Sequence, residues 1–300
     1  MKKLILVIAL QILGLFSSCS KNDVASTDET STPVTNDIYI AGYEFNGANF
    51  VAKYWKNNMG TNLSDGTKYA VAQSIVVVGE DVYVAGDEFN GTAEVAKYWK
   101  NGTAFNLSDG TQNAYATSIV VSGSNVYVAG YELYGGQYVA KYWKDGIATN
   151  LSDGSNTTSA VSIAIDGKDI YVAGNEYNGT HYVAKYWKNG IESILSNGTN
   201  DVFVKSIVVV GKDVYVVGYE DNGTNSFVKY WKNGIATVLD DGTIYNYGLS
   251  MSVLGNDVYV AGYQVVGGTK GIAKYWKNDI ATNIGSNASQ SSVTYSIFVK

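Results

Sequence analysis

Short apolar runs, separated by glycine, asparagine and aspartate, recur along most of the chain. In one stretch such runs occupy residues 74–78, 82–86, 95–100 and 104–108. They are rich in Val, Ile, Tyr and Trp, which favour strands. The middle two runs are apolar on both alternating faces, as a sheet packed on both sides requires. Turn residues such as Gly79-Glu80 lie between the runs, so this stretch is predicted to form four short antiparallel strands.

This four-strand unit recurs throughout the chain. Each unit carries a Lys-Tyr-Trp-Lys motif, and its tryptophans stand 44 or 45 residues apart, at Trp55, Trp99, Trp143, Trp187, Trp231 and Trp276. Units of this length with four antiparallel strands are typical of the blades of a β-propeller. The sequence therefore predicts an all-β fold, a six-bladed β-propeller spanning residues 37–300, with these six tryptophans in structural positions.

The two ends of the repeat array are complementary. The first unit begins at its second strand, near Asp37, and residues 296–300 repeat the sequence of a first strand. A C-terminal strand paired beside residues 38–44 would give the first blade its fourth strand and would cover an open sheet edge. We therefore expect the C-terminal strand to join the first blade and close the ring.

The repeats resemble known extracellular propeller repeats. The hairpin sequence of residues 162–174, Ser-Ile-Ala-Ile-Asp-Gly-Lys-Asp-Ile-Tyr-Val-Ala-Gly, is similar to NHL-type and SBBP-type repeats. The Ala-Lys-Tyr-Trp-Lys-Asp-Gly sequence of residues 140–146, followed by Leu151, resembles the HAF-type repeat. The resemblance implies a propeller fold and an exported protein, and it implies no catalytic residue.

The N-terminus is typical of a targeting segment. Two lysines precede an apolar stretch from Leu4 to Phe16, which is too short to span a bilayer, and Cys19 follows as the only cysteine. This arrangement resembles a bacterial lipoprotein signal. The alternative is an ordinary secretory signal with an incidental cysteine. We expect a signal peptide at residues 1–18, a lipidated Cys19 and a flexible tether at residues 19–36.

The residues after Cys19 extend this expectation to a location. The Ser-Lys-Asn-Asp sequence resembles the start of lipoproteins that Bacteroidota send to the outer leaflet. The interpretation is an exported protein held at the outer membrane by lipid on Cys19, with exposure at the cell surface and the choice of leaflet left open.

Charge and composition exclude several partners. The formal charge is −6, or −8 without Lys2 and Lys3, and all 21 basic residues are lysine. Nucleic-acid binding needs a basic surface, so no nucleic-acid partner is expected. The lack of arginine also argues against a sialidase, because members of that propeller class share an arginine triad. One cysteine and one histidine, His181, cannot build a typical metal site. We expect no metal, no cofactor and a monomer.

The candidate ligand site lies at one end of the predicted blades. The loops between second and third strands, and those leading into the next first strand, are longer and more variable than the tight turns at the other end. Variable loops on a rigid scaffold are where binding residues concentrate. This rim carries candidate ligand-binding residues suited to a sugar or a peptide: Tyr69, Tyr115, Phe203, Tyr245, Tyr247 and His181. The alternative is that its aromatic residues pack between blades.

The same rim carries repeated carboxylates. A glutamate follows the second strand in five units, at Glu44, Glu88, Glu132, Glu176 and Glu220, and a lysine recurs on the third strand. Paired carboxylates can hydrolyse glycosides, but a symmetric ring of Glu–Lys surface pairs is the simpler interpretation. The function predicted first is therefore a non-enzymatic binding or scaffold protein for a glycan, peptide or protein. The alternatives are a polysaccharide-acting enzyme that uses rim carboxylates and a structural spacer.

Overall fold

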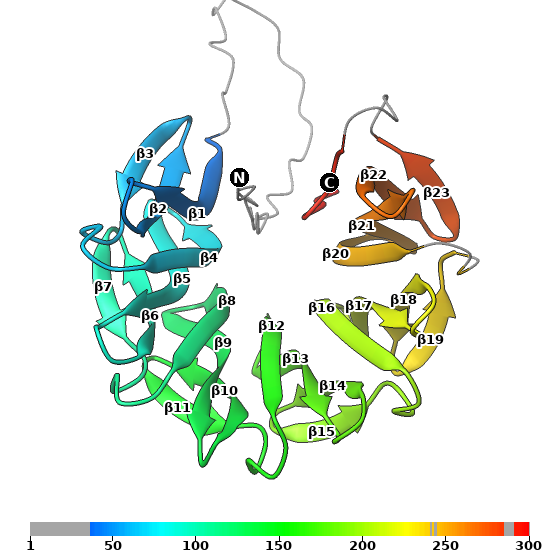
Figure 1. Cartoon of the computed structure of the whole chain (residues 1–300), viewed down its shortest axis with the longest axis horizontal. Coiled ribbons are helices and arrows are strands. Elements are labelled where there is room, and N and C mark those ends of the chain that lie inside the picture. The colour runs from blue at the N-terminus through cyan, green and yellow to red at the C-terminus, as the bar shows by residue number, and fades with distance from the viewer. Residues whose placement is uncertain (1–36, 241, 243–244, 285–290, 300) are drawn as a thin grey trace, which may run out of the picture.

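The chain folds into six antiparallel sheets arranged around a central axis (Figure 1). This computed structural model describes residues 37–300 except 241, 243–244, 285–290 and 300. The predicted signal peptide, Cys19 and the tether lie outside the described residues. Within the described part of the chain, no helix is long and apolar enough to cross a membrane.

Each sheet is one repeat unit, and we call the sheets blades one to six in chain order. Blade one contains β1 (Tyr39–Phe45), β2 (Phe50–Lys56) and β3 (Met59–Asn62). Blade two contains β4 (Ala70–Val78), β5 (Asp81–Phe89), β6 (Glu94–Lys100) and β7 (Thr103–Asn106). Blade three contains β8 (Ala114–Ser122), β9 (Asn125–Tyr134), β10 (Gln137–Lys144) and β11 (Ile147–Asn150).

The second half of the chain repeats this pattern. Blade four contains β12 (Thr158–Asp166), β13 (Asp169–Tyr177), β14 (Tyr182–Lys188) and β15 (Ile191–Ile194). Blade five contains β16 (Asp201–Val210), β17 (Asp213–Asp221), β18 (Ser226–Lys232) and β19 (Ile235–Val238). Blade six contains β20 (Asn246–Leu254), β21 (Asp257–Val266), β22 (Lys270–Lys277) and β23 (Ile280–Asn283).

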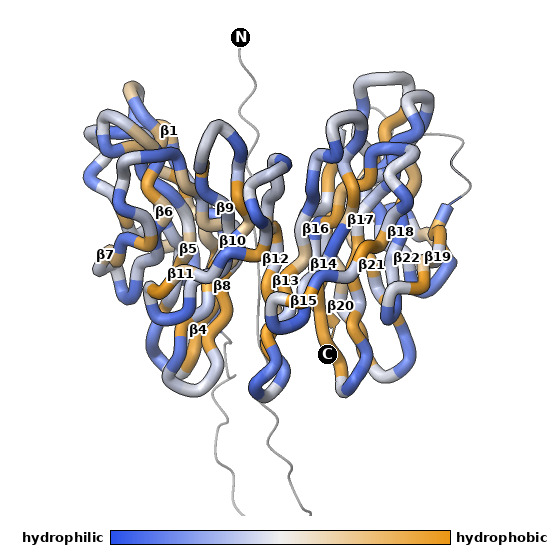
Figure 2. The backbone as a smooth tube through the Cα atoms, turned by 90° about the horizontal axis from the view of Figure 1, so that it is seen from below, coloured by the Kyte–Doolittle hydropathy of each residue, from blue (hydrophilic) through white to orange (hydrophobic). Residues whose placement is uncertain are grey.

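The predicted fold class is confirmed. In each blade, strands that follow one another in the chain are neighbours in the sheet, and the first strand of blades two to six is the innermost. Hydrophobic residues run along the inner strands, while the connecting loops at both ends are hydrophilic (Figure 2). Short antiparallel connections of this kind need no helix, which is why the whole repeat is built from hairpins.

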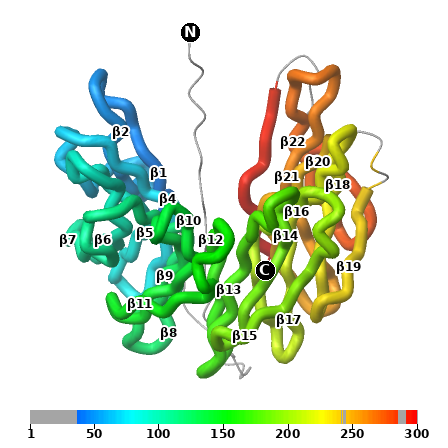
Figure 3. The backbone as a smooth tube through the Cα atoms, turned by 60° about the horizontal axis from the view of Figure 1, so that its bottom comes forward, coloured from blue at the N-terminus to red at the C-terminus, as the bar shows by residue number. Residues whose placement is uncertain are grey.

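The structure differs from the prediction at the two ends of the array. The first sheet has three strands, β1, β2 and β3, and residues 291–299 form no strand. Instead, the amide nitrogens of Ile297 and Val299 each donate a hydrogen bond of 3.3 Å to a side-chain oxygen of β20, Ser250 Oγ and Ser252 Oγ respectively. Figure 3 shows this segment beside the sixth blade and apart from β1. The predicted pairing with residues 38–44 is therefore absent from the described residues.

A physical reason accounts for this difference. Between interior blades, the backbone of one innermost strand donates to a serine of the preceding one, as from Ile163 N to Ser118 Oγ at 3.3 Å. The C-terminal segment makes the same contact with blade six through Ile297. Backbone pairing with β1 requires in addition that β1 lie about 4.8 Å away. The repeat sequence specifies the contact between neighbouring blades, but it does not bring the two ends of the array together.

The hydrophobic core is divided into five layers, one between each pair of consecutive blades. Each layer contains the tryptophan of the later blade, packed on the inner residues of the earlier one. Trp143, for example, shares a cluster with Tyr83, Ala96 and Leu107 of blade two. The five tryptophans in these layers are at most 1% exposed, whereas Trp55 of blade one is only half-buried. Five of the six tryptophans are thus enclosed between blades.

The tight turns at one end of the blades follow directly from the sequence. Asn101 and Gly102 between β6 and β7 have φ angles of 51° and 84°, as a type I′ turn requires. The Asn101 side chain accepts a hydrogen bond from Val82 N and donates one to Asp81. Lys100 pairs with the same carboxylate at 2.8 Å and lowers its pKa. The asparagine therefore shapes the turn and ties it to the neighbouring hairpin.

The innermost strands contain a feature that the sequence pattern did not predict. In each of β4, β8, β12, β16 and β20, the register with the second strand shifts by one residue, just before the repeated serine. A β-bulge of this kind turns one extra side chain out of the regular ladder. The second strand has a glycine beside the bulge; a Cβ on Gly130 would lie 1.9 Å from the carbonyl oxygen of Tyr115. Glycine is required there by close backbone approach.

Candidate functional site

The longer loops meet at one end of the blades, which we call the loop rim. The start of each innermost strand pairs with the end of the second strand, as Ala70 does with Glu88. The loop that enters the first of these strands therefore lies beside the loop that leaves the second. The strand register therefore places both loop types on one rim, as predicted: the loops between second and third strands and the loops that enter the innermost strands.

Six aromatic side chains form a continuous row on this rim across blades four, five and six. Successive ring centroids lie 4.8 to 5.3 Å apart, within the range of favourable aromatic pairs. We call this row the aromatic band; its members are Tyr177, Tyr182, Phe203, Tyr219, Tyr247 and Tyr263. The contacts between Tyr182 and Phe203 and between Tyr219 and Tyr247 join neighbouring blades. The band therefore runs across two blade interfaces.

The structure separates the predicted aromatic residues into groups. Phe203 and Tyr247 belong to the aromatic band, whereas Tyr115 packs on Tyr131 and Tyr138 in blade three. Tyr69 contacts Phe50 of blade one, with ring centroids 5.6 Å apart.

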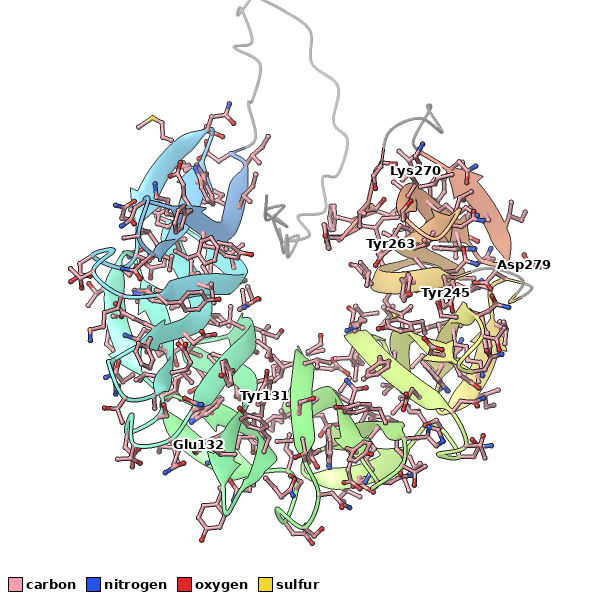
Figure 4. The ribbon with its side chains drawn as sticks, viewed as in Figure 1. Tyr131, Glu132, Tyr245, Tyr263, Lys270 and Asp279 are labelled. Carbon is pink, nitrogen blue, oxygen red and sulfur yellow. The ribbon has the colours of Figure 1, made fainter. Side chains whose placement is uncertain are left out.

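Tyr245 lies on blade six, as does Tyr263, and Tyr131 and Glu132 mark the matching region of blade three (Figure 4). The backbone carbonyl of Tyr245 accepts a hydrogen bond from Val265 N at 2.8 Å. Tyr245 is not part of the ring contacts that make up the aromatic band, so only two of the five predicted aromatic residues belong to it.

The prediction placed these aromatic residues in loops, and for three of them this was wrong. Tyr115, Phe203 and Tyr247 lie inside β8, β16 and β20. The innermost strands begin four or five residues before the repeated serine, because the segment ahead of the bulge also pairs with the second strand. The apolar run that marked these strands in the sequence begins only after the bulge.

The two interpretations of these aromatic residues both have a structural basis. Phe203, Tyr219 and Tyr247 are half-buried, and Tyr177 is 38% exposed. In blade three, burial raises the pKa of Tyr131 to about 12. Packing between blades is therefore real, and the rings also keep accessible surface at the rim.

His181 lies in the loop between β13 and β14. Its backbone nitrogen donates to Asn178 Oδ1 at 2.8 Å, and its Nδ1 lies 3.4 Å from Asp201 Oδ1. Asp201 Oδ1 also accepts a hydrogen bond from Tyr182 N. His181 therefore sits beside the aromatic band. Among the residues that the structure describes, no three His, Cys, Asp or Glu side chains are placed to hold a metal ion.

The repeated glutamates are ion-paired within their own hairpins. Glu44, Glu88, Glu132, Glu176 and Glu220 contact Lys53, Lys97, Lys141, Lys185 and Lys229 respectively. The pairing was predicted, but the lysines do not lie at the surface, since their side chains are 8% to 18% exposed. Four of the carboxylate partners are 14% to 23% exposed, whereas Glu44 is 61% exposed. The ion pair offsets the cost of burying the lysine charge.

One rim cavity, between blades one and two, is lined by carboxylates from unlike segments. It has a volume of about 260 Å³ and its walls include Asp65, Glu88 and Asp109. Glu88 is paired with Lys97. Asp65 and Asp109 each accept hydrogen bonds from a threonine two residues on, and these bonds lower the pKa of both carboxyls. A general acid needs a raised pKa, so neither Asp65 nor Asp109 is arranged as one.

The acidic side chains with a raised pKa lie elsewhere in blade two, at positions where the repeats differ in sequence. Asp87 on β5 and Glu94 on β6 stand where blade one has Tyr43 and Phe50. Asp87 is 2% exposed; burial, followed by the charge of Glu94, raises its pKa to about 8, against a smaller opposing effect of Lys97. Burial also raises the pKa of Glu94. Comparing equivalent positions between units would have revealed this pair in the sequence.

The five bulge residues form a second set that sequence analysis missed. They are Gln73, Thr117, Val161, Lys205 and Leu249, each half-buried, and they line the space around the central axis. The residue that precedes Ser296 in the C-terminal segment, Tyr295, lines the same space. The flanking serines are constant while these residues differ in every blade. This contrast was readable in the sequence, but the bulge that turns these side chains inward was not.

No protein-family model and no curated protein matches the chain. Among solved structures it is similar to TolB from Acinetobacter baumannii, with a TM-score of 0.54 and 14% sequence identity over 85% of this chain and 65% of that one. It is also similar to an acylaminoacyl peptidase from Pyrococcus horikoshii, with a TM-score of 0.53 and 13% identity over 84% of this chain and 43% of the peptidase.

A third similar structure is the β-propeller domain of the Trilobed protease from Pyrococcus furiosus, which has an open velcro topology. The TM-score is 0.53 at 12% identity, over 83% of this chain and 78% of that domain. The chain thus spans less than two thirds of the TolB and peptidase chains that it matches. At these identities the likeness shows that this chain has the β-propeller fold.

Proposed function

We propose that this chain is a non-enzymatic cell-envelope lipoprotein that presents its loop rim to a glycan, peptide or protein partner. The observation that carries the proposal is the aromatic band. Tyrosines provide a large contact area and a polar end, and they lose little conformational freedom on binding. A row of six touching rings on a rigid scaffold offers such an area already ordered.

The anchor and location in this proposal rest on the N-terminal sequence. Cys19 follows a charged start and a short apolar stretch, and the residues after it suit a tether. Lipid on Cys19 would hold the propeller at the outer membrane. Replacing Cys19 by Ser should then move the protein from the membrane fraction to the soluble fraction, and unchanged membrane retention would contradict this part of the proposal.

The binding experiment uses glycan and peptide arrays, which also separate the two ligand classes. The variants Tyr177→Ala and Tyr263→Ala each remove one end of the aromatic band. The matched control is Tyr134→Ala, since Tyr134 is on the same rim, is 74% exposed and lies outside the band. We expect both band variants to weaken binding about tenfold or more, the scale of an interface hot spot, and the control to leave it unchanged.

Two outcomes contradict the proposal. Turnover of a bound polysaccharide that is lost on substituting a rim carboxylate would favour the enzyme. Failure of the protein to bind any glycan, peptide or envelope protein would favour the structural spacer.

A further inference from the structure

Two cavities meet along the central axis below the loop rim. The larger has a volume of about 310 Å³ and is bordered by apolar side chains of the innermost strands and the C-terminal segment, among them Ile119, Ile163, Ile207, Met251 and Ile297. The smaller, of about 120 Å³, lies at the level of the bulge residues. Ser206, Ser250 and Ser296 border both cavities, so the two adjoin each other. We call them the apolar chamber and the polar mouth.

The polar mouth contains one charged side chain. Of the residues that line it, Lys205 is the cation, and Gln73, Thr117 and Tyr295 add neutral polar groups. Thr117 Oγ1 donates to backbone carbonyls of its own blade and of blade four, so it is already engaged. The mouth therefore has one positive charge, set at the entrance to an apolar space.

Lys205 differs from the other inward-reaching lysines. The five lysines of the Glu–Lys pairs each contact a carboxylate, whereas among the described residues no carboxylate lies within 4.0 Å of Lys205 Nζ. Its ammonium group lies 5.8 Å from the ring centroid of Phe203 and 5.6 Å from that of Tyr219. Burial lowers its pKa. A half-buried cation held only by aromatic faces is favourably placed to take an anionic partner.

Taken together, the geometry points to a binding site for a single-chain amphiphile, with a carboxylate head in the polar mouth at Lys205 and an unbranched alkyl tail in the apolar chamber. The anionic head supplies the ion pair that Lys205 lacks. The tail removes apolar surface from water on both sides of the contact. This site adjoins the rim surface of the proposed function, because Lys205 lies beside Phe203 and Tyr219 of the aromatic band. It does not involve Tyr177 and Tyr263, the ends of the band, so binding at the two sites can be tested separately.

The size of the apolar chamber sets the length of the tail. A methylene group takes up about the volume of one molecule of liquid water, about 30 Å³. The chamber of about 310 Å³ therefore accommodates a tail of about ten carbons. A branched or aromatic tail would fit less well among side chains that approach from blades two to six and from the C-terminal segment.

Decanoate is the probe that tests this site. Its binding to the full chain carrying Cys19→Ser is measured by isothermal titration calorimetry at neutral pH, with decanol and acetate as probes that lack the head charge or the tail. We expect decanoate to bind about tenfold or more tightly than decanol. Affinity should fall about fourfold for each methylene removed, from decanoate through octanoate to hexanoate.

Two variants assign the binding to the two cavities. Lys205→Met keeps the side-chain length and removes the charge; it should weaken decanoate about tenfold and leave decanol unchanged. Ala164→Trp fills the apolar chamber, which Ala164 borders, and should abolish binding of both. The control is Lys212→Met, at an exposed lysine of the turn between β16 and β17. Thermal unfolding of each variant shows that it is folded.

Several results would overturn the proposal. Equal affinity for decanoate and decanol would mean an apolar cavity with no recognition of an anion. If Lys212→Met and Lys205→Met lost the same decanoate affinity, the loss would come from the lower net charge of the protein and not from a contact with Lys205. No binding of decanoate to the folded parent protein, at any concentration below that at which it forms micelles, would mean that there is no such site.

Discussion

The five interfaces between consecutive blades differ from the place where blades six and one face each other. At each of the five, the tryptophan of the later blade is enclosed by the earlier blade and is at most 1% exposed. Trp55 occupies the same position in its own repeat, yet it is half-buried. Blade one also lacks an innermost strand in its sheet, since residues 296–299 contact blade six instead.

This comparison shows what one repeat contributes alone and what its neighbour must add. The Lys-Tyr-Trp-Lys strand forms in every unit, because its hairpin supplies all of its backbone hydrogen bonds. Burial of the tryptophan is different, since the side chain projects toward the preceding blade. A blade without a predecessor therefore folds locally but leaves its largest side chain partly in water.

The largest expected effect comes from truncating a tryptophan at an interior interface. Trp143→Ala should lower the free energy of unfolding by about 3 to 5 kcal/mol, because it removes a fully buried aromatic side chain and leaves a cavity. Trp55→Ala should cost less than half as much. Urea unfolding followed by circular dichroism measures both, and Trp143→Phe serves if the alanine variant does not fold. Equal losses at the two positions would show that blade six covers Trp55 in solution.

A second prediction concerns how well an interior interface excludes water, and it uses Asp87 of blade two. Its folded-state pKa is raised from 3.8 to about 8. Between these values the folded state binds one proton more than the unfolded state, so stability falls as the pH rises through this window. Asp87→Asn removes the titrating group. The variant should therefore gain stability over the parent between pH 5 and pH 7.5, by up to about 1 kcal/mol per pH unit.

The matched position in blade four provides the control. Asn175 Oδ1 accepts a hydrogen bond from Val204 N at 2.8 Å, and its Nδ2 donates to the carbonyl of the same residue at 3.4 Å. Asn175→Asp should introduce the pH dependence that Asp87→Asn removes, and chemical unfolding at several pH values measures both. A stability difference that does not change with pH would mean that water reaches Asp87.

The smallest expected effect is the loss of a single hydrogen bond between a serine and a backbone amide. The paired variants compare this bond between two interior strands with the same bond to the C-terminal segment. Ser118→Ala leaves Ile163 N without its acceptor inside a buried layer and should cost about 1 to 3 kcal/mol. Ser250→Ala removes the same kind of contact to Ile297 N, which is less buried, so a cost of about 1 kcal/mol or less is expected. Hydrogen exchange at these two amides is the direct measurement. Equal protection of both in the parent protein would indicate that the C-terminal segment is held as firmly as an interior strand.

Local structure was the most predictable part of this protein. Turn residues such as Asn189-Gly190 and the spacing of the tryptophans were sufficient to predict four hairpin strands per blade. They also placed the two long-loop types on one rim. Of the six residues in the aromatic band, only Phe203 and Tyr247 were predicted. These two and Tyr115 were assigned to loops, because the strand pairing ahead of each bulge has no apolar run to mark it.

The same sequence could not predict which side chains meet. Phe203 contacts Tyr219 within blade five, and Tyr219 contacts Tyr247 because the second strand of one blade approaches the innermost strand of the next at the rim. Asp87 and Glu94 acquired raised pKa values from burial between blades, which no local pattern shows. Nothing in the sequence distinguished Lys205. The bulge in β16 places it on the central axis.

The hairpins and the number of blades depend on contacts within about 44 residues, so the order of amino acids was enough to determine them. Three features depended on tertiary structure: the position of the C-terminal segment, the partial exposure of Trp55 and the placement of Lys205 beside an apolar cavity. Each of them requires groups from different blades to come together around the axis. That geometry is the sum of all the blade-to-blade packing angles, and no single repeat contains it.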